Sequence, residues 1–276
     1  MLSDVFVPLF TFPDEIAIEP PPGLSGLLGA FAAHVTFCGV EIDVPDLKDR
    51  WGAQLAALPQ MAEEVERRSR ERAASMLKLA MGVPADFQGH AVTLSVPFVN
   101  PGLAVARQAR NHDVTVMLVR AGTADGVAIS EHILFGSGRP LLLLPADRPV
   151  PARLGRVAIA WDGGATAYRA VHDAMPLVVA ANDVVVLTAP ADKQVAAAST
   201  QALLGYLGRH GVEPRLVEVA SGQQGIGHDL QAAAMSQQAD LLVMGAYGHS
   251  RLREFVLGGA TSGVLNQTSL PVLMSR

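Results

Sequence analysis

The feature that most constrains this chain is a repeated alternation of short apolar segments with segments of helical periodicity. The clearest part is the C-terminal 120 residues, where strands are predicted at Arg156–Trp161, Asp183–Ala189, Arg215–Ala220, Asp240–Gly245 and Pro271–Ser275. Amphipathic helical segments separate these strands. Near-continuous apolar strands alternating with helices are typical of a parallel sheet covered on both faces. These residues are therefore predicted to form one doubly wound α/β domain.

The N-terminal part of the chain repeats this plan less regularly. Strands are predicted at Asp4–Phe10, Val35–Val40, Ala91–Val96, Val114–Val119 and Pro140–Leu144. A long helix is predicted over residues 46–81, interrupted at Pro59. Within it, Glu and Arg recur four residues apart between Glu63 and Arg72, which is the spacing of weak ion pairs on a solvated helix surface.

A proline-rich boundary separates the two parts. Residues 145–153 read PADRPVPAR, with three prolines among charged and small residues, which indicates an extended linker. We predict a tandem repeat, with domains at residues 1–148 and 153–276. The fold class is α/β, with two doubly wound parallel five-stranded sheets of the Rossmann-like type.

Charge and composition exclude several classes of function. The net charge is −5, and residues 1–150 hold 12 Lys/Arg against 17 Asp/Glu, while the remainder holds 9 against 9. Neither part therefore has the excess of positive charge needed for non-specific binding to nucleic-acid phosphates. Aromatic residues make up only 5%, so there is little material for stacking single-stranded bases. No nucleic-acid partner is predicted.

Cys38 is the sole cysteine, which excludes an intrachain disulfide and a cysteine zinc site and is typical of a reducing compartment. Its apolar neighbours predict a buried, unreactive thiol. The eight histidines show no metal-ligand spacing, so no metal site is predicted.

The N-terminus lacks the basic region of a signal peptide, and the apolar runs are far shorter than the roughly 20 residues of a membrane span. We expect a cytoplasmic protein without membrane attachment.

A glycine pattern follows the strand that ends at Gly245. It reads G-x2-G-x9-G-G-x-T, from Gly245 and Gly248 to Gly258–Thr261. Glycines let a backbone approach a ligand closely, and amides at a helix start favour an anion. Asp162, which ends the first strand of the same part, is expected at the same edge of the sheet, where its carboxylate can accept hydrogen bonds from a ribose or adenine. The alternative is that these glycines are turn and cap residues and that Asp162 only forms a turn.

On Asp162, Gly245, Gly248 and Gly258, residues 155–276 resemble the universal stress protein family. The resemblance implies a nucleotide site whose residues are Ala160, Asp162, Ala189, Met244, Gly245, Gly248, Gly258, Gly259, Ala260 and Thr261. It places the fold in the adenine nucleotide alpha hydrolase-like group. Where the family has Ser or Thr, this chain has Gly259, which removes one hydroxyl hydrogen bond worth about 1–2 kcal/mol, or roughly tenfold in affinity.

The resemblance further implies a stress-response protein that binds ATP, with AMP or ADP as alternatives and Mg²⁺ accompanying the nucleotide. No catalytic residue is predicted, because neither a phosphate-binding G-x4-G-K-[ST] loop nor a nucleophile elbow is present. We expect a non-enzymatic sensor, with at most very slow hydrolysis, that acts on an unknown protein partner. The alternative is a nucleotide-free scaffold that works through protein–protein contacts.

The N-terminal part departs from the family pattern. Its first strand ends at Val7–Thr11 without an aspartate, and residues 120–126 lack the paired glycines. We therefore predict a degenerate copy that binds no nucleotide. The resemblance also implies that Pro140–Leu144 and Pro271–Ser275 pair the two domains as an internal pseudo-dimer, with a homodimer as a further possibility. A second glycine cluster, Gly222–His228, is interpreted as a flexible loop.

Overall fold

The computed structural model describes residues 2–12, 20–44, 58–120, 122–190, 196–220, 222–248 and 259–276. The first half of the chain holds β1 (Leu2–Phe10), α1 (Leu24–Phe31), β2 (Ala32–Asp43), α2 (Leu58–Gly82), β3 (Gln88–Pro97), α3 (Pro101–Ala109), β4 (Val114–Val119), α4 (Ala124–Gly136) and β5 (Leu141–Pro145). The second half holds β6 (Arg156–Ala160), α5 (Ala165–Ala180), β7 (Asp183–Thr188), α6 (Ala197–Arg209), β8 (Arg215–Glu218), α7 (Ile226–Ser236), β9 (Leu241–Gly245), α9 (Ala260–Asn266) and β10 (Val272–Ser275).

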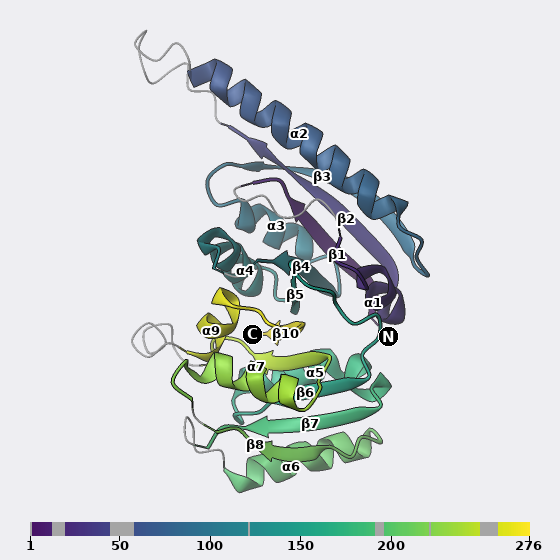
Figure 1. Ribbon diagram of the computed structural model, residues 1–276, viewed down its shortest axis with the longest axis vertical. Helices are drawn as coiled ribbons and strands as arrows, with labels where there is room; N and C mark the ends of the chain where they lie inside the picture. The colour runs from purple at the N-terminus through teal and green to yellow at the C-terminus, as the bar shows by residue number, and fades with distance from the viewer. Residues whose placement is uncertain are drawn as a thin grey trace.

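The ten strands formed by the described residues belong to a single sheet in the order β3-β2-β1-β4-β5-β10-β9-β6-β7-β8 (Figure 1). The expectation of an α/β fold with parallel strands is confirmed, but the expectation of two separate sheets is wrong. The two five-stranded units merge because β5 and β10, each at the edge of its own half, pair with one another. Their pairing is antiparallel, whereas the other strand pairs of the sheet are parallel.

The joint between the halves is short and fully apolar. Leu141, Leu142 and Leu143 of β5 face Met274, Leu273 and Val272 of β10, and each of these six residues is at most 1% exposed. The pairing expected for Pro140–Leu144 and Pro271–Ser275 is therefore present. Burial at about 25 cal/mol per Å² of apolar surface makes such a joint a strong driving force for holding the halves together.

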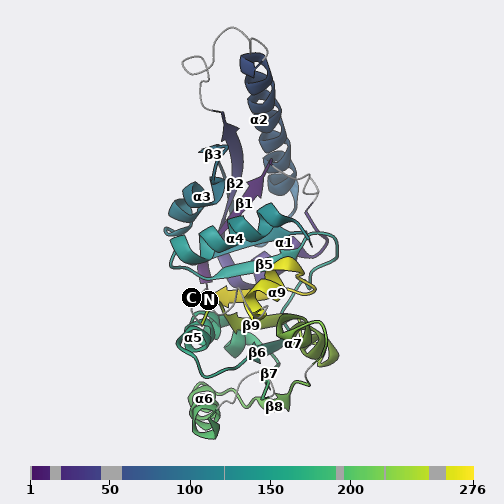
Figure 2. The same cartoon turned by 90° about the vertical axis from the view of Figure 1, so that its left-hand side faces the viewer.

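Helices cover both faces of the sheet, as Figure 2 shows with the strands as a twisted column between them. Alternate residues of one strand enter different cores: Val157 and Ile159 pack in one, and Ala158 and Ala160 in the other. The first core receives side chains from α1, α2, α5 and α6, and the second from α3, α4, α7 and α9. The two halves thus repeat the same layering, as their sequence pattern predicted.

The connection between the halves is docked against α1. The Val150 N–H donates to the carbonyl of Pro22 at 2.9 Å. Gly23 has a φ of +93°, and a Cβ there would lie 2.0 Å from the Val150 carbonyl oxygen, so the contact requires glycine. Proline spacing alone predicted an extended linker but could not reveal this contact.

Three elements of the first half are about twice as long as their counterparts. Strands β2 and β3 have 12 and 10 residues against 6 and 4 in β7 and β8, and α2 has 25 against 13 in α6. The N-terminal portion of the predicted long helix, residues 46–57, lies outside the described residues. From Leu58 onward the helix is continuous.

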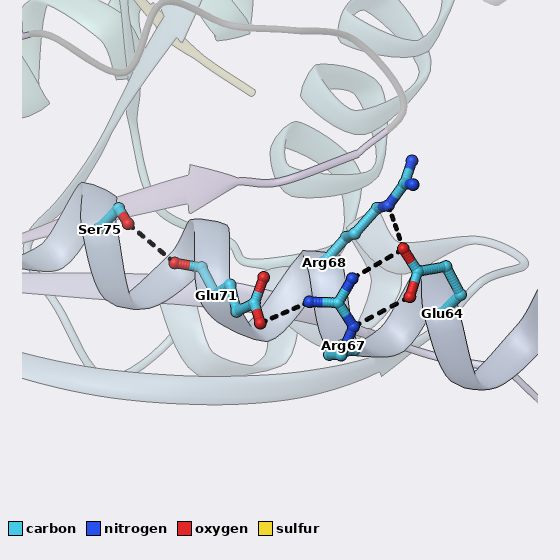
Figure 3. A network of polar contacts seen from close by, with 5 residues as sticks. All are labelled: Glu64, Arg67, Arg68, Glu71 and Ser75. Carbon is cyan, nitrogen blue, oxygen red and sulfur yellow. Dashed lines mark hydrogen bonds and ion pairs between the residues drawn. The ribbon is translucent and has the colours of Figure 1, made fainter.

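The outer surface of α2 carries a network of ion pairs (Figure 3). Glu64 accepts hydrogen bonds from both Arg67 and Arg68, and Arg67 also reaches Glu71. These side chains are 40–74% exposed, so solvent screens the pairs and they add little to the stability of the fold. The predicted solvated surface is present, although Arg67 pairs with Glu64 and Glu71 and not at the expected spacing from Glu63.

Cys38 lies in the second core with no exposed surface, and this burial raises the pKa of its thiol to about 12. The thiolate is the reactive form, so the folded protein should not react with a thiol reagent at pH 8. In 6 M guanidinium chloride, the unfolded chain should react with a chromogenic thiol reagent. The absorbance should show one equivalent of released chromophore per chain. Stoichiometric labelling of the native protein within minutes would contradict this burial.

Candidate functional site

The predicted site residues gather at the carboxyl edge of the second half, where neighbouring parallel strands end. Ala160 ends β6, Ala189 follows β7, and Met244 and Gly245 end β9. Strand β6 lies between β7 and β9 in the sheet, so these positions come from three adjacent strands. Ala160 is 9% exposed and Met244 3%, while Ala189 is half-buried, so all three side chains pack against the second core.

Asp162 stands in the turn that leads from β6 into α5. Its Oδ1 accepts a hydrogen bond of 2.8 Å from the Gly164 N–H, and Gly163 adopts a φ of +71°. Gly164 then caps α5 at its N-terminus. The turn-forming role considered for Asp162 is therefore real. This hydrogen bond takes one of the roughly four acceptor positions of an ionised carboxylate.

Gly245 and Gly248 pass close to the first turn of α5. A Cβ on Gly245 would lie 2.6 Å from both the Ala167 nitrogen and the Thr166 hydroxyl oxygen, and one on Gly248 would lie 2.8 Å from the same hydroxyl and 3.8 Å from the Asp162 Oδ2. These glycines are thus required by contact with the protein's own helix. The same contact brings Asp162, Thr166 and Gly248 together. Sequence reasoning missed Thr166, because nothing in the local pattern links α5 to the end of β9.

The first residues of α9 form one wall of the candidate site. Gly259 is the N-cap residue, with Ala260 half-buried after it. Thr261 is only 2% exposed, and its hydroxyl oxygen accepts a hydrogen bond of 3.0 Å from the Tyr247 N–H. Thr261 therefore fastens α9 to the segment after β9. Gly258, which the sequence placed in the phosphate cradle, lies outside the described residues.

Tyr247 is the residue that sequence reasoning missed most clearly. It has a φ of +53°, which is uncommon for a residue with a side chain, and it is 9% exposed. Its hydroxyl donates to Glu131 of α4 in the first half, and its ring lies 4.9 Å from that of Phe135, measured between centroids. The only available signal was a bulky aromatic residue between Gly245 and Gly248.

Each half contains an aspartate whose carboxylate accepts hydrogen bonds from two backbone N–H groups of the first strand. These matching contacts show which residues of the two halves correspond. In the second half, the Asp240 Oδ2 accepts hydrogen bonds from the N–H groups of Gly155 and Arg156, at 2.8 and 2.9 Å. In the first half, the Asp113 Oδ2 accepts from the N–H groups of Ser3 and Asp4, at 2.8 and 3.1 Å. Asp4 therefore corresponds to Arg156, and Asp113 to Asp240.

Counting from these pairs, Phe10 occupies the position of Asp162, and Leu118 that of Gly245. Both are buried, at 3% and 7% exposed. An apolar aromatic ring thus stands where the second half has a carboxylate. The absence of an aspartate was visible in the sequence, whereas the filling of this edge with a packed ring was not.

Helix α2 also fills this edge of the first half. The Ser69 Oγ lies 2.6 Å from the Thr11 hydroxyl and accepts from the Ile42 N–H at 2.9 Å. The Glu66 carboxylate accepts from the Val44 N–H at 3.0 Å. Backbone donors at the ends of the strands are therefore satisfied by the protein itself.

The second glycine cluster has structural partners. The Gly222 N–H donates to Asp229 at 2.7 Å, and Gly225 has a φ of +91° before α7. A Cβ on Gly227 would lie 2.5 Å from the Ala260 carbonyl oxygen, so α7 and α9 meet at this residue. These contacts give three of its glycines a role in packing or in a turn.

Among the described residues, no group of three or more His, Cys, Asp or Glu side chains is placed to hold a metal ion. No helix within the described ranges has the length and apolarity needed to cross a membrane.

Residues 154–276 match the model of the universal stress protein family. The second half of the chain is therefore similar to universal stress proteins. The universal stress protein Slr1230 of Synechocystis is 48% identical over 54 residues, which cover 18% of this chain and 19% of that protein. The chain thus aligns with about a fifth of this curated relative.

One solved structure shows a similar fold over almost all of the chain. A universal stress protein from Archaeoglobus fulgidus matches 99% of this chain and 96% of its own, at 17% identity and a TM-score of 0.62. A universal stress protein solved in complex with cAMP aligns with 45% of this chain and 97% of its own, at 19% identity and a TM-score of 0.36.

Replacing Gly227 by Ala should destabilise the protein, because the new methyl group would press on the Ala260 carbonyl and the Gly263 Cα. We expect a loss of about 1–3 kcal/mol in the free energy of unfolding. Gly205→Ala in α6 is the matched control, because the nearest atom to its Cβ is the flexible Arg209 guanidinium at 3.7 Å. This control should gain about 0.5–1 kcal/mol. Urea denaturation measures both, and equal shifts of the two midpoints would contradict the α7–α9 contact.

Proposed function

We propose that the second half binds an adenine nucleotide, ATP first, at the carboxyl edge of β6, β7 and β9, and that the protein acts as a non-enzymatic sensor. The observation that carries this proposal is the meeting of Asp162 and Gly248 at the first turn of α5, beside three strand ends. Open α/β sheets bind ligands at this edge, where loops from several strands converge. The similarity to universal stress proteins supports the same reading.

The chemistry of each residue suits a part of the ligand. The Asp162 carboxylate has acceptor positions for ribose hydroxyls, and Ala160 and Ala189 have small side chains that leave room for a base. The Thr261 hydroxyl accepts from the Tyr247 N–H, and a hydroxyl that accepts one hydrogen bond can also donate one, here to a phosphate oxygen. The backbone of Gly245–Gly248 and Gly259 would lie beside the ribose and phosphates.

Mg²⁺ would arrive with the nucleotide, held mainly by phosphate oxygens and water, since this ion needs only one or two protein carboxylates. We assign no catalytic residue. Phosphoryl transfer needs metal ligands, a cation against the developing charge and a group that orients the nucleophile. Gly164 and Gly248 lie beside the Asp162 carboxylate, and main chain of this kind suits binding better than turnover. Occupancy would then be read by a protein partner, and a homodimer stays a prediction.

Asp162→Ala tests the site. It should weaken ATP binding about 10–100-fold, because it removes charged hydrogen-bond acceptors. Asp173→Ala is the matched control: it removes a carboxylate from α5, where Asp173 pairs with Arg169 at 2.8 Å. Isothermal titration with ATP and AMP measures both. Equal affinities of the two variants and the wild type would contradict the assigned site.

The scaffold remains the second candidate, because most of the large apolar side chains that are exposed in the described residues belong to the first half. They lie on α2, on β3 and beside them: Met61, Val65, Leu79, Met81, Val83, Val92, Phe98, Val99 and Leu103, each 38–68% exposed. Apolar surface of this kind marks sites of protein contact. The titration separates the two candidate functions. If folded protein binds no nucleotide up to millimolar concentration, the scaffold is the candidate that remains.

A further inference from the structure

Tyr247 connects the proposed nucleotide site to the half of the chain that lacks one. Its main chain lies between Gly245 and Gly248, and its N–H donates to Thr261 on the opposite wall. Its side chain leaves the site and reaches α4, where its hydroxyl donates to Glu131 and its ring packs on Phe135. Tyr247 thus contacts Thr261 across the proposed site and α4 in the first half of the chain.

Helix α4 is a firm support for this contact. Ile129, Ile133 and Leu134 anchor it in the second core and are at most 5% exposed. The guanidinium of Arg276, the C-terminal residue, lies 3.9 Å from the centre of the Phe135 ring on which Tyr247 packs. Such a cation over an aromatic face is attractive. The phenol of Tyr247 therefore meets an already fixed surface.

A second contact crosses the joint from the segment that precedes α4. The Gly122 N–H, in the segment after β4, donates at 2.9 Å to the carbonyl of Asn266 at the end of α9. The first half therefore contacts Tyr247, after β9, and also the C-terminal end of α9. The left-handed φ of Tyr247 fits this picture, because strained backbone persists where its surroundings hold it.

We propose that α4 of the first half positions residues 245–248 through Tyr247, so that the first half regulates the nucleotide site of the second. This inference rests on the proposed function and names the regulation of the same site. A ligand beside Gly245–Gly248 must fit the backbone conformation that the Tyr247–Glu131 contact holds. By thermodynamic linkage, whatever α4 does to ligand affinity, the ligand does equally to the contact with α4.

Tyr247→Phe and Glu131→Ala test this coupling, with Tyr168→Phe as the matched control. Tyr168 lies on α5, its ring packs edge-on against Trp161, and it is 45% exposed. Each test variant should weaken ATP binding about fivefold or more, as expected for coupled sites. The double variant should bind no more weakly than either single one, because both remove the same contact. Glu131→Gln retains an acceptor oxygen and should restore most of the affinity.

Hydrogen exchange supplies a readout that does not depend on nucleotide. In the ligand-free protein, peptides covering residues 241–248 should exchange faster in Tyr247→Phe than in the wild type or in Tyr168→Phe. Saturating ATP should slow exchange in α4 of the wild type but not of Tyr247→Phe, which a merely destabilising substitution would not produce.

Additive losses of affinity, wild-type affinity in both single variants, or exchange in residues 241–248 unchanged by Tyr247→Phe would each overturn the coupling. If the wild type binds no ATP, the proposed function fails by itself. The exchange of ligand-free Tyr247→Phe then still decides whether α4 holds this segment.

Discussion

The antiparallel pairing of β5 with β10 joins two parallel units through residues that are almost completely buried. A parallel sheet ends in an unpaired strand edge, which is costly when it is apolar and exposed. Here each half covers the edge of the other. The pairing also sets α4 beside α9, because these helices flank the joint on the same face of the sheet. The contacts of Tyr247 and Gly122 across the joint are consequences of that placement.

The two halves share a framework and differ at the edge where ligands would bind. Asp113 and Asp240 hold the first strand of each half in the same way. At the carboxyl edge, however, the first half buries Phe10, and α2 supplies hydroxyl and carboxylate partners for its strand ends. The second half presents a carboxylate and glycines there. One copy of the repeat thus has the chemistry of a site, and the other that of a closed core.

Much of this architecture could be predicted from the sequence, because alternation of apolar strands with helices is a local signal. The same holds for Asp162 and Gly245, since the carboxyl ends of parallel strands share an edge. The contact of Gly245 with Thr166 could not be predicted, because it depends on how closely α5 approaches β9. Tyr247 and Glu131 are 116 residues apart, and no local pattern signals such a pair. The merging of two sheets into one likewise depends on the pairing of distant edges.

The similarity to universal stress proteins rests on the match of residues 154–276, and the fold on the strand pairing. The proposed ligand depends instead on the geometry around Asp162. A crystal structure of the full chain grown with ATP is the most direct test of that geometry. We predict one nucleotide per chain, with its base toward Ala160 and Ala189 and its phosphates toward Gly248 and Gly259. A nucleotide bound at the Phe10 edge of the first half, or the second edge filled by the protein's own side chains, would contradict it.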